Sequence, residues 1–322
     1  MTANQPTRIP AEADEVLIVP NAKAGAGPGH ERVERLVAAL AARQLAPRIV
    51  RDLAAIAELA AERQRAGRLR AVVAAGGDGT VAEVVNRIAA GIPLAVFPLG
   101  TENLLAQYIN MPRGAVEAAQ VIAAGQIVQQ DAGNASGRLF VLMVGCGFDA
   151  EVVRRLHDER DGHISRWSYL KPIWESIRNY DYPELRIICE PGGPDERSIV
   201  ARFAFVINVP RYALGLQFTP GAESDDGLFN LCALHRGSFI DGLRYFWHVV
   251  FQSHPRLEDC TLATARRLRI ESDRPVPYEL DGDPGGILPL DVEILPGRLT
   301  LLVPPEWIER RCATGSASVT PR

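Results

Sequence analysis

The sequence has few of the residues that build disulfide frames or transition-metal sites. Its five cysteines are dispersed with no Cys-x-x-Cys pair, and its six histidines form no His-x-x-x-His or Cys/His cluster. An odd, scattered set of cysteines is typical of reduced thiols in a cytosolic protein. We therefore expect neither a disulfide frame nor a zinc site.

The sequence also lacks an excess of positive charge and a long apolar run. Its net charge of −4 at pH 7 gives no electrostatic reason to expect a nucleic-acid partner. No apolar run approaches the roughly 20 residues that cross a bilayer. The polar N-terminus has neither the pattern of a signal peptide nor that of a transit peptide. We expect a cytoplasmic protein.

Two hydrophobic patterns alternate along the first 130 residues: short apolar runs typical of buried strands, and segments whose apolar residues recur at helical spacing. Alternating strands and helices predict a parallel sheet covered on both faces. We therefore expect a Rossmann-like α/β domain over residues 1–132. Its expected strands are 15–20, 47–52, 69–75 and 93–97, and its expected helices are 30–43, 53–66 and 81–90. Residues 129–133 break this rhythm.

Short apolar runs separated by Gly, Pro and Asp turns dominate from Arg138 onward. This density predicts a β-sandwich or partly open barrel over residues 133–304. Residues 305–322 are predicted to be a partly disordered tail. The expected strands are 139–144, 185–190, 201–209, 228–234, 267–271, 276–280, 290–295 and 299–303, and the expected helices are 167–179 and 239–252.

Gly76-Gly77-Asp78-Gly79-Thr80 lies where strand 69–75 meets the next helix. Open parallel sheets bind ligands at the carboxyl ends of their strands, where glycines allow close backbone approach and helix N–H groups suit phosphate. Neither G-x-x-x-x-G-K-[ST] nor G-x-G-x-x-G is present, so a phosphate site here would use other parts. The Asp78 carboxylate fits beside phosphate if a divalent cation lies between them. A helix N-cap in a tight turn is the alternative.

Further motifs surround this loop in a fixed order: Asn21-Ala22-Lys23-Ala24-Gly25-Ala26-Gly27 before it, then Glu83 and Asn86, Pro98-Leu99-Gly100-Thr101-Glu102-Asn103, Asp226-Gly227 and Asp281-Gly282-Asp283. Together they resemble the diacylglycerol kinase catalytic-domain family, which includes soluble bacterial lipid kinases and their sphingosine-kinase relatives. The resemblance extends over residues 15–304. The GGDGT core alone is shared with NAD kinases and 6-phosphofructokinases.

The resemblance implies that ATP is the phosphoryl donor. Ala22 replaces the usual Pro of the first loop. Glu83 and Asn86 share one helix face, which is either solvated or, as the motif implies, packed or hydrogen-bonded under the loop. The implied nucleotide-binding residues are Asn21, Gly25, Gly27, Gly76, Gly77, Asp78, Gly79, Thr80, Glu83, Thr101 and Asn103.

The resemblance also implies Mg²⁺. Asp78 would organise a catalytic Mg²⁺, whereas a carboxylate from Asp226 and carbonyl oxygens of Glu223 and Leu228 would hold a structural one. Leu104 replaces the Asp of the family's Gly-Thr-x-Asn-Asp-Phe-Ala segment, which is the second Asp of the family's network of metal-bound waters. Either Glu102 substitutes for that carboxylate, or a smaller network of metal-bound waters is held by Asp78 and Asp131 alone. Asp131 and Asp226 would otherwise be ordinary turn residues.

Asp281-Gly282-Asp283 matches the family's Asp-Gly-Glu, whose Glu is the proposed base for the substrate hydroxyl. The resemblance thus implies that Asp283, one methylene shorter, is catalytic together with Asp78. A hairpin turn is the alternative interpretation of this segment. Gly145-Cys146-Gly147-Phe148-Asp149-Ala150 also matches a family segment, Gly-x-Gly-Phe-Asp-Ala.

These features predict an ATP-dependent lipid kinase that phosphorylates a hydroxyl of diacylglycerol or a related membrane lipid in an interdomain cleft. The expected partner is a membrane lipid met by transient peripheral contact, and a homodimer is left open. The aromatic-rich face of helix 239–252 favours core packing over an interfacial, lipid-sensing role. The alternatives are a kinase of a soluble substrate, with NAD leading, and a non-catalytic nucleotide- or lipid-binding protein.

Overall fold

The computed structural model describes residues 7–21, 28–158, 180–212 and 215–315. The chain divides into unit 1, residues 1–130 and 297–322, and unit 2, residues 131–296. Two long strands, β6 (Gln126–Ala135) and β17 (Leu290–Leu302), run through the boundaries. Residues 297–304, which the sequence places with the β-rich domain, therefore belong to unit 1.

Unit 1 contains a parallel sheet in the order β17-β5-β4-β2-β3. Every residue of β4 and β5 is buried, as parallel strands covered on both faces require. The short β1 pairs antiparallel with β6. The strand bounds are β1 Thr7–Arg8, β2 Glu15–Pro20, β3 Ala46–Ile49, β4 Leu69–Gly76 and β5 Pro93–Pro98.

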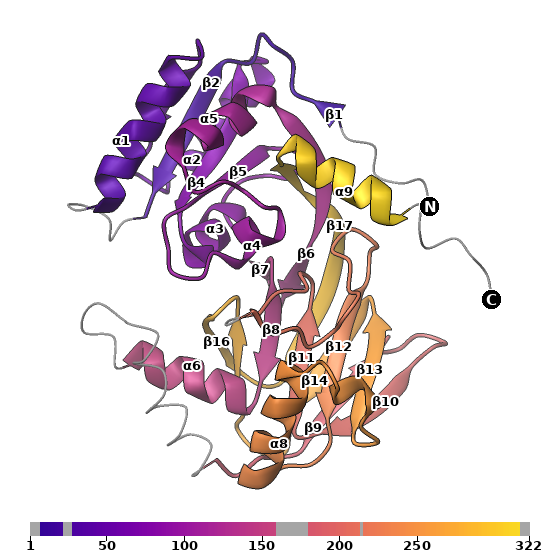
Figure 1. Cartoon of the computed structure of the whole chain (residues 1–322). Coiled ribbons are helices and arrows are strands. Elements are labelled where there is room, and N and C mark those ends of the chain that lie inside the picture. The colour runs from indigo at the N-terminus through magenta and orange to yellow at the C-terminus, as the bar shows by residue number, and fades with distance from the viewer. Residues whose placement is uncertain (1–6, 22–27, 159–179, 213–214, 316–322) are drawn as a thin grey trace. The chain divides into compact units, whose positions relative to one another are not determined.

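Helices cover this sheet, and Figure 1 shows α1 and α5 side by side along it. Val33, Leu36 and Leu40 on one face of α1 are buried in the core. The helix bounds in unit 1 are α1 Pro28–Ala41, α2 Ile56–Arg65, α3 Asp78–Val85, α4 Leu104–Tyr108, α5 Ala115–Ala124 and α9 Pro305–Gly315.

Helix α9 occupies residues that the sequence assigns to a partly disordered tail. Trp307 is buried, its Nε1 donates to the carbonyl oxygen of Tyr108 at 3.0 Å, and its ring meets the Tyr108 ring edge-on at 6.0 Å. These contacts hold the first turn of α9 against the end of α4. Residues 316–322 lie outside the described residues.

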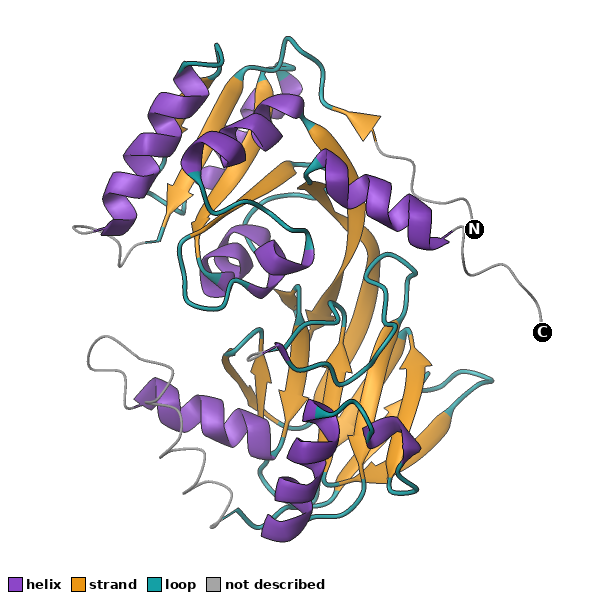
Figure 2. Cartoon of the chain, viewed as in Figure 1, coloured by secondary structure: helices purple, strands orange, loops and turns teal. Residues whose placement is uncertain are grey.

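Unit 2 is a sandwich of antiparallel strands (Figure 2). One sheet has the order β13-β12-β11-β8-β15-β16, and the other contains β10-β9-β14-β17 with β6 and β7. Side chains from both sheets form one core, in which Phe140 and Phe229 stack at 5.6 Å. The predicted fold class is confirmed. The remaining strand bounds are β7 Arg138–Phe140, β8 Met143–Cys146, β9 Leu185–Cys189, β10 Arg197–Ala201, β11 Phe203–Ile207, β12 Phe229–Leu234, β13 Cys260–Ala265, β14 Arg267–Glu271, β15 Pro277–Leu280 and β16 Asp283–Ile287.

Two helices, α6 (Phe148–Asp158) and α8 (Phe239–Val250), and the 3-10 turn η3 (His254–Arg256) accompany these strands. The predicted helix 167–179 lies outside the described residues. No helix within the described part of the chain is long and apolar enough to cross a membrane.

Candidate active site

Asp78 begins α3, but its carboxylate binds a different helix. Its Oδ2 accepts the N–H of Leu104 at 2.9 Å and its Oδ1 accepts the N–H of Leu105 at 3.3 Å, at the start of α4. Gly77 is the N-cap of α3. Asp78 therefore joins the GGDGT loop to the Gly100–Asn103 loop, a role that neither sequence interpretation includes.

The two loops touch through their backbones, which requires glycine at specific positions. A Cβ at Gly100 would lie 2.7 Å from Cα of Gly77, closer than real Cβ contacts occur. A Cβ at Gly76 would clash with the Thr80 hydroxyl. The N–H of Leu99 donates to the Gly76 carbonyl at 2.9 Å. The loops that follow β4 and β5 are thus one packed element.

Asn103 closes the second loop. Its side chain is 2% exposed, and its backbone has the left-handed φ of 54° that Asn tolerates better than most residues. The Gly100 N–H donates to Oδ1 at 2.8 Å, and Nδ2 donates to the Gly100 carbonyl at 2.6 Å. Asn103 thus sets the loop shape and leaves the neighbouring Thr101 exposed.

Burial raises the pKa of the Asp78 carboxyl, and the nearby charge of Glu102 adds to this effect. The N–H groups of Leu104 and Leu105 partly offset it by stabilising the carboxylate. The residue implied as a substitute carboxylate, Glu102, is therefore close enough to act on Asp78. A cation beside Asp78 would favour its ionised form.

The other predicted nucleotide contacts of unit 1 have different outcomes. The Asn21 N–H donates to the Ala75 carbonyl at 3.0 Å, which places Asn21 at the carboxyl end of β2, next to the end of β4. Glu83 is exposed on α3, so the expectation that it packs under the loop is wrong. Gly25 and Gly27 lie outside the described residues.

In unit 2, Asp131 lies in β6 and binds the loop before β12. It is buried, its Oδ2 accepts the Gly227 N–H at 2.8 Å, and its own N–H donates to the Ser224 carbonyl at 2.8 Å. The alternative of a turn-forming Asp131 is therefore wrong. Asp226 Oδ1 accepts the Leu228 N–H at 2.9 Å. Burial raises the Asp226 pKa, and the charge of Asp131 contributes further.

The Asp281-Gly282-Asp283 turn divides its two carboxylates between different tasks. Asp281 accepts three backbone N–H groups, from Val141 at 2.7 Å, Leu142 at 2.7 Å and Met143 at 3.0 Å. The Asp281 carboxylate therefore has a structural role, since it binds the backbone at the start of β8. Asp283 is half-buried at the start of β16, opposite Leu280 of β15. The segment is a hairpin turn, and this geometry is compatible with a base at Asp283.

Two buried carboxyl groups lie beneath this turn, and the sequence analysis assigns a role to neither. Glu279 is 1% exposed on β15, and Asp149 lies in the first turn of α6 and accepts a hydrogen bond from the Tyr212 hydroxyl. Burial raises the pKa of Asp149 to about 6 and that of Glu279 well above its ordinary value. The Gly-x-Gly-Phe-Asp-Ala match marks Asp149, but nothing in the sequence marks Glu279.

The described residues contain no group of three or more His, Cys, Asp or Glu side chains arranged to hold a metal ion. The loop of Glu223, Asp226 and Leu228 would instead combine one carboxylate with backbone carbonyl oxygens, which are ligands that hard cations prefer. The raised pKa of Asp226 fits this donor set, because a bound cation would offset the clustered negative charge.

Comparison with known proteins identifies both halves of the chain. Residues 15–135 match the model of the diacylglycerol kinase catalytic domain, and residues 142–303 match that of the YegS C-terminal NAD kinase beta sandwich-like domain. The diacylglycerol kinase of Bacillus subtilis is 25% identical over 74% of this chain and 79% of its own length. That of Staphylococcus carnosus is 25% identical over 68% and 71%.

Solved structures share the fold. A diacylglycerol kinase from Bacillus anthracis has a TM-score of 0.66 at 21% identity, covering 91% of this chain and 98% of its own. An NAD kinase from Archaeoglobus fulgidus in complex with ATP has a TM-score of 0.52 at 12% identity, covering 94% and 99%. With the two matching domain models, the chain belongs to the family of bacterial lipid kinases that carry the diacylglycerol kinase catalytic domain.

Proposed function

We propose that the protein transfers the γ-phosphoryl group of ATP to a hydroxyl of diacylglycerol or a closely related membrane lipid. The observation that carries this proposal is the packed pair of loops in unit 1, joined by Asp78 and closed by Asn103. The N–H groups in the first turn of α3 would face the ATP phosphates. Catalysis of phosphoryl transfer rests mainly on such positioning and on charge neutralisation.

Mg²⁺ would supply the charge neutralisation beside the phosphates. The residues that would hold it are Asp78, with Glu102 near, and the loop carboxylate of Asp226 would hold a second, structural ion with carbonyl oxygens of Glu223 and Leu228. The raised pKa values of Asp78 and Asp226 support both assignments, since a cation would stabilise their charged forms.

Asp283 would accept the proton of the lipid hydroxyl. Its neighbour Asp281 already accepts three N–H groups, whereas the half-buried Asp283 carboxylate accepts no such set from the described residues. A base needs to approach the hydroxyl to within about 2.6–3.2 Å or through one water. The hairpin of β15 and β16 would hold the shorter Asp side chain at that distance.

The test is a phosphorylation assay with labelled ATP and Mg²⁺ on mixed micelles of diacylglycerol or ceramide, beside NAD in solution, with the product identified by mass spectrometry. Product on a micellar lipid supports the proposal. Product on NAD alone would instead support a kinase of a soluble substrate. ATP binding without any product would support a non-catalytic binding protein.

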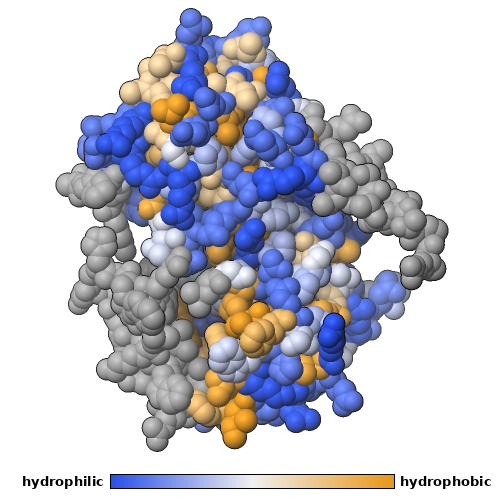
Figure 3. Space-filling model, in the orientation of Figure 1, coloured by the Kyte–Doolittle hydropathy of each residue, from blue (hydrophilic) through white to orange (hydrophobic). Residues whose placement is uncertain are grey.

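Helix α8 offers a surface for the membrane contact that such a substrate requires. Six large apolar side chains are exposed along it: Ile240, Leu243, Phe246, Trp247, Val250 and Phe251. Ile240 is 74% and Phe251 72% exposed, so the expectation that the aromatic face packs in the core is wrong. Figure 3 shows apolar atoms gathered over this part of the chain.

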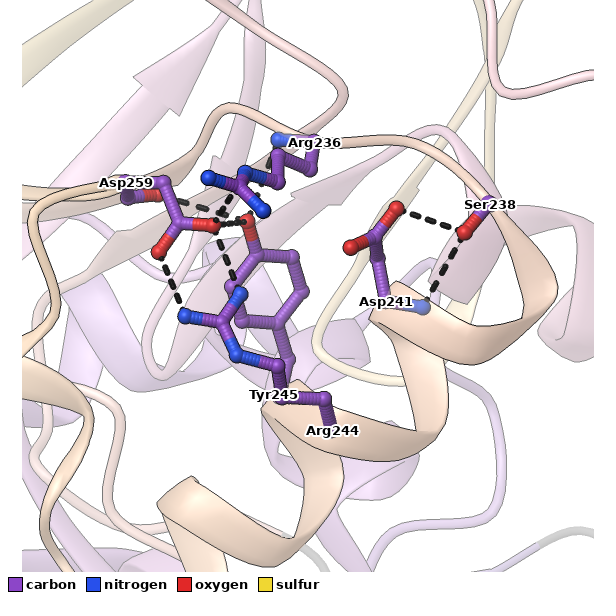
Figure 4. A network of polar contacts seen from close by, with 6 residues as sticks. All are labelled: Arg236, Ser238, Asp241, Arg244, Tyr245 and Asp259. Carbon is purple, nitrogen blue, oxygen red and sulfur yellow. Dashed lines mark hydrogen bonds and ion pairs between the residues drawn. The ribbon is translucent and has the colours of Figure 1, made fainter.

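Polar contacts attach the opposite face of α8 to the rest of unit 2 (Figure 4). Arg244 forms a two-point ion pair with Asp259 at 2.7 and 2.9 Å, and the Tyr245 hydroxyl donates to the same carboxylate at 2.9 Å. Ser238 caps the helix by accepting the Asp241 N–H at 3.1 Å. The aromatic face is thereby held outward, as in helices that lie in a membrane interface.

Sedimentation with vesicles of phosphatidylcholine and phosphatidylglycerol tests this contact. We expect Trp247→Ser/Phe251→Ser to lose vesicle binding and turnover on vesicle-borne diacylglycerol, while turnover on a water-soluble, short-chain diacylglycerol is kept. Val116→Ser, which changes a similarly exposed apolar residue in unit 1, is the control. Equal vesicle binding by the double variant and the wild type would refute this role of α8.

A further inference from the structure

The region beneath the Asp281–Asp283 turn contains two carboxyl groups whose oxygens face the same point. A Cβ built on Gly145 would clash with Asp149 Oδ2 and would lie 2.9 Å from Glu279 Oε1. Both oxygens are buried, and neither has a hydrogen-bond partner among the residues that the structure describes. The absent side chain of Gly145 thus makes room for two oxygen atoms that would repel each other if both groups were ionised.

The other oxygen of each carboxyl group is occupied. Asp149 Oδ1 accepts the Tyr212 hydroxyl, and Glu279 Oε2 accepts the Gly282 N–H at 2.6 Å. Gly282 is the central residue of the turn that carries Asp283. The pair therefore connects the first turn of α6 to the hairpin of the proposed base.

We infer that Glu279 is a protonated carboxylic acid that shares its proton with Asp149 and thereby positions the Asp283 turn. Glu279 Oε1–H donates to Asp149 Oδ2, Asp149 carries the single negative charge, and Tyr212 donates to that charge from the other side. Every buried atom of the two carboxyl groups then has a partner. The role in positioning Asp283 rests on the proposed function, whereas the shared proton does not.

The charged and titratable groups around Glu279 and Asp149 favour a state in which the two carboxyl groups together hold one proton. Burial and the Asp149 charge both raise the Glu279 pKa, and the hydrogen bond from the Gly282 N–H offsets this only in part. Asp281 adds a further negative charge. Burial raises the pKa values of the Cys146 thiol and the Tyr212 hydroxyl. Both groups therefore stay neutral and add no charge beside the pair.

The sign of the pH dependence follows from the raised pKa values. The folded state holds a proton that the unfolded chain releases above about pH 4.5, so stability from this pair is lost as pH rises through its folded pKa values. We expect the melting temperature of Glu279→Gln to rise relative to wild type between pH 5 and pH 8. The amide keeps an acceptor for Gly282 and a donor for Asp149 without needing a proton.

Glu279→Leu is the disruptive variant, because it leaves the Gly282 N–H unpaired and the Asp149 charge buried alone. We expect its melting temperature to fall by about 5 °C or more. We expect its kcat to fall by about 100-fold with the KM for ATP unchanged, since a turn displaced by about 1 Å misplaces the base. Glu279→Gln should keep wild-type kcat, and Glu258→Gln, an exposed change in unit 2, is the control for pH.

A melting-temperature difference between Glu279→Gln and wild type that does not change with pH would overturn the shared proton. So would a Glu279→Gln variant as unstable as Glu279→Leu, because an ionised Glu279 could not be replaced by an amide. If Asp283→Ala keeps the wild-type rate, Asp283 is not the base, and the role of Glu279 in positioning it is refuted as well. The pH-dependent difference in melting temperature would still report the shared proton.

Discussion

Replacing Asp78 by Asn tests the junction of the two loops, because it removes one negative charge and keeps the size of the side chain. The remaining oxygen would keep the 2.9 Å bond from the Leu104 N–H, whereas the amide nitrogen would face the Leu105 N–H, whose present bond is 3.3 Å long. Losing that longer bond costs about 1 kcal/mol. Removing a carboxylate whose pKa is raised by burial offsets part of this cost.

We therefore expect Asp78→Asn to melt within about 4 °C of the wild type. Turnover should fall by at least about 100-fold, as it does when a group that stabilises transition-state charge is removed. The assay is lipid phosphorylation at saturating ATP and Mg²⁺, well below the melting temperature, with differential scanning fluorimetry on the same samples. Stabilisation by Mg²⁺ and ATP should also be smaller than in the wild type.

Glu58→Gln, which neutralises an exposed carboxylate on α2 of the same unit, is the matched control and should match the wild type in both assays. Turnover of Asp78→Asn within about threefold of the wild type would refute the catalytic role and leave Asp78 only as the group that joins the two loops by binding the start of α4. A large loss of stability with normal turnover of the folded fraction would lead to the same conclusion.

Three further predictions concern unit 2. Removing Mg²⁺ in the absence of ATP should lower the melting temperature of the wild type, and Asp226→Ala should abolish this dependence; a wild type indifferent to Mg²⁺ would exclude the structural ion. Asp283→Ala should lose about 10²–10⁴ in kcat with ATP affinity little changed, and an unchanged kcat would show that another group accepts the proton. Asp281→Asn should keep its contacts to Leu142 and Met143 but leave the Val141 N–H without its acceptor. This loss costs about 2 kcal/mol and should lower the melting temperature by about 4–8 °C. A variant that melts at the wild-type temperature would contradict this role of Asp281.

Local pattern was sufficient for strands whose apolar residues are contiguous, as in β2, or alternate strictly with charged residues, as in β14. Strands β2 and β14 have the bounds that the sequence predicts, and β4 and β5 each extend one residue further. Strand β16 was not predicted because its sequence, Asp-Pro-Gly-Gly-Ile, consists largely of turn residues. Its extended conformation comes from pairing with β15, which no local period reports.

The motifs placed the loops of the candidate site, but they did not reveal the contacts that hold them. Asp78 binds Leu104 across 26 positions of sequence, and Asp281 binds Val141 across 140. Such contacts depend on the register of distant strands and on the path of each loop. The outward face of α8 escaped prediction for a related reason, because a helical period identifies an apolar face without saying what covers it.

Leu104 shows how much a departure from the family pattern can leave intact. The contact that residue 104 makes with Asp78 comes from its backbone N–H, which any residue except proline provides, so the missing carboxylate does not break the junction of the two loops. What Leu104 changes is the charge, since an Asp here would stand next to an Asp78 carboxyl whose pKa burial and Glu102 already raise. The frame of the site is set by Gly100 and Asn103, which are present, and the substitution therefore alters the electrostatics of the site without altering its geometry.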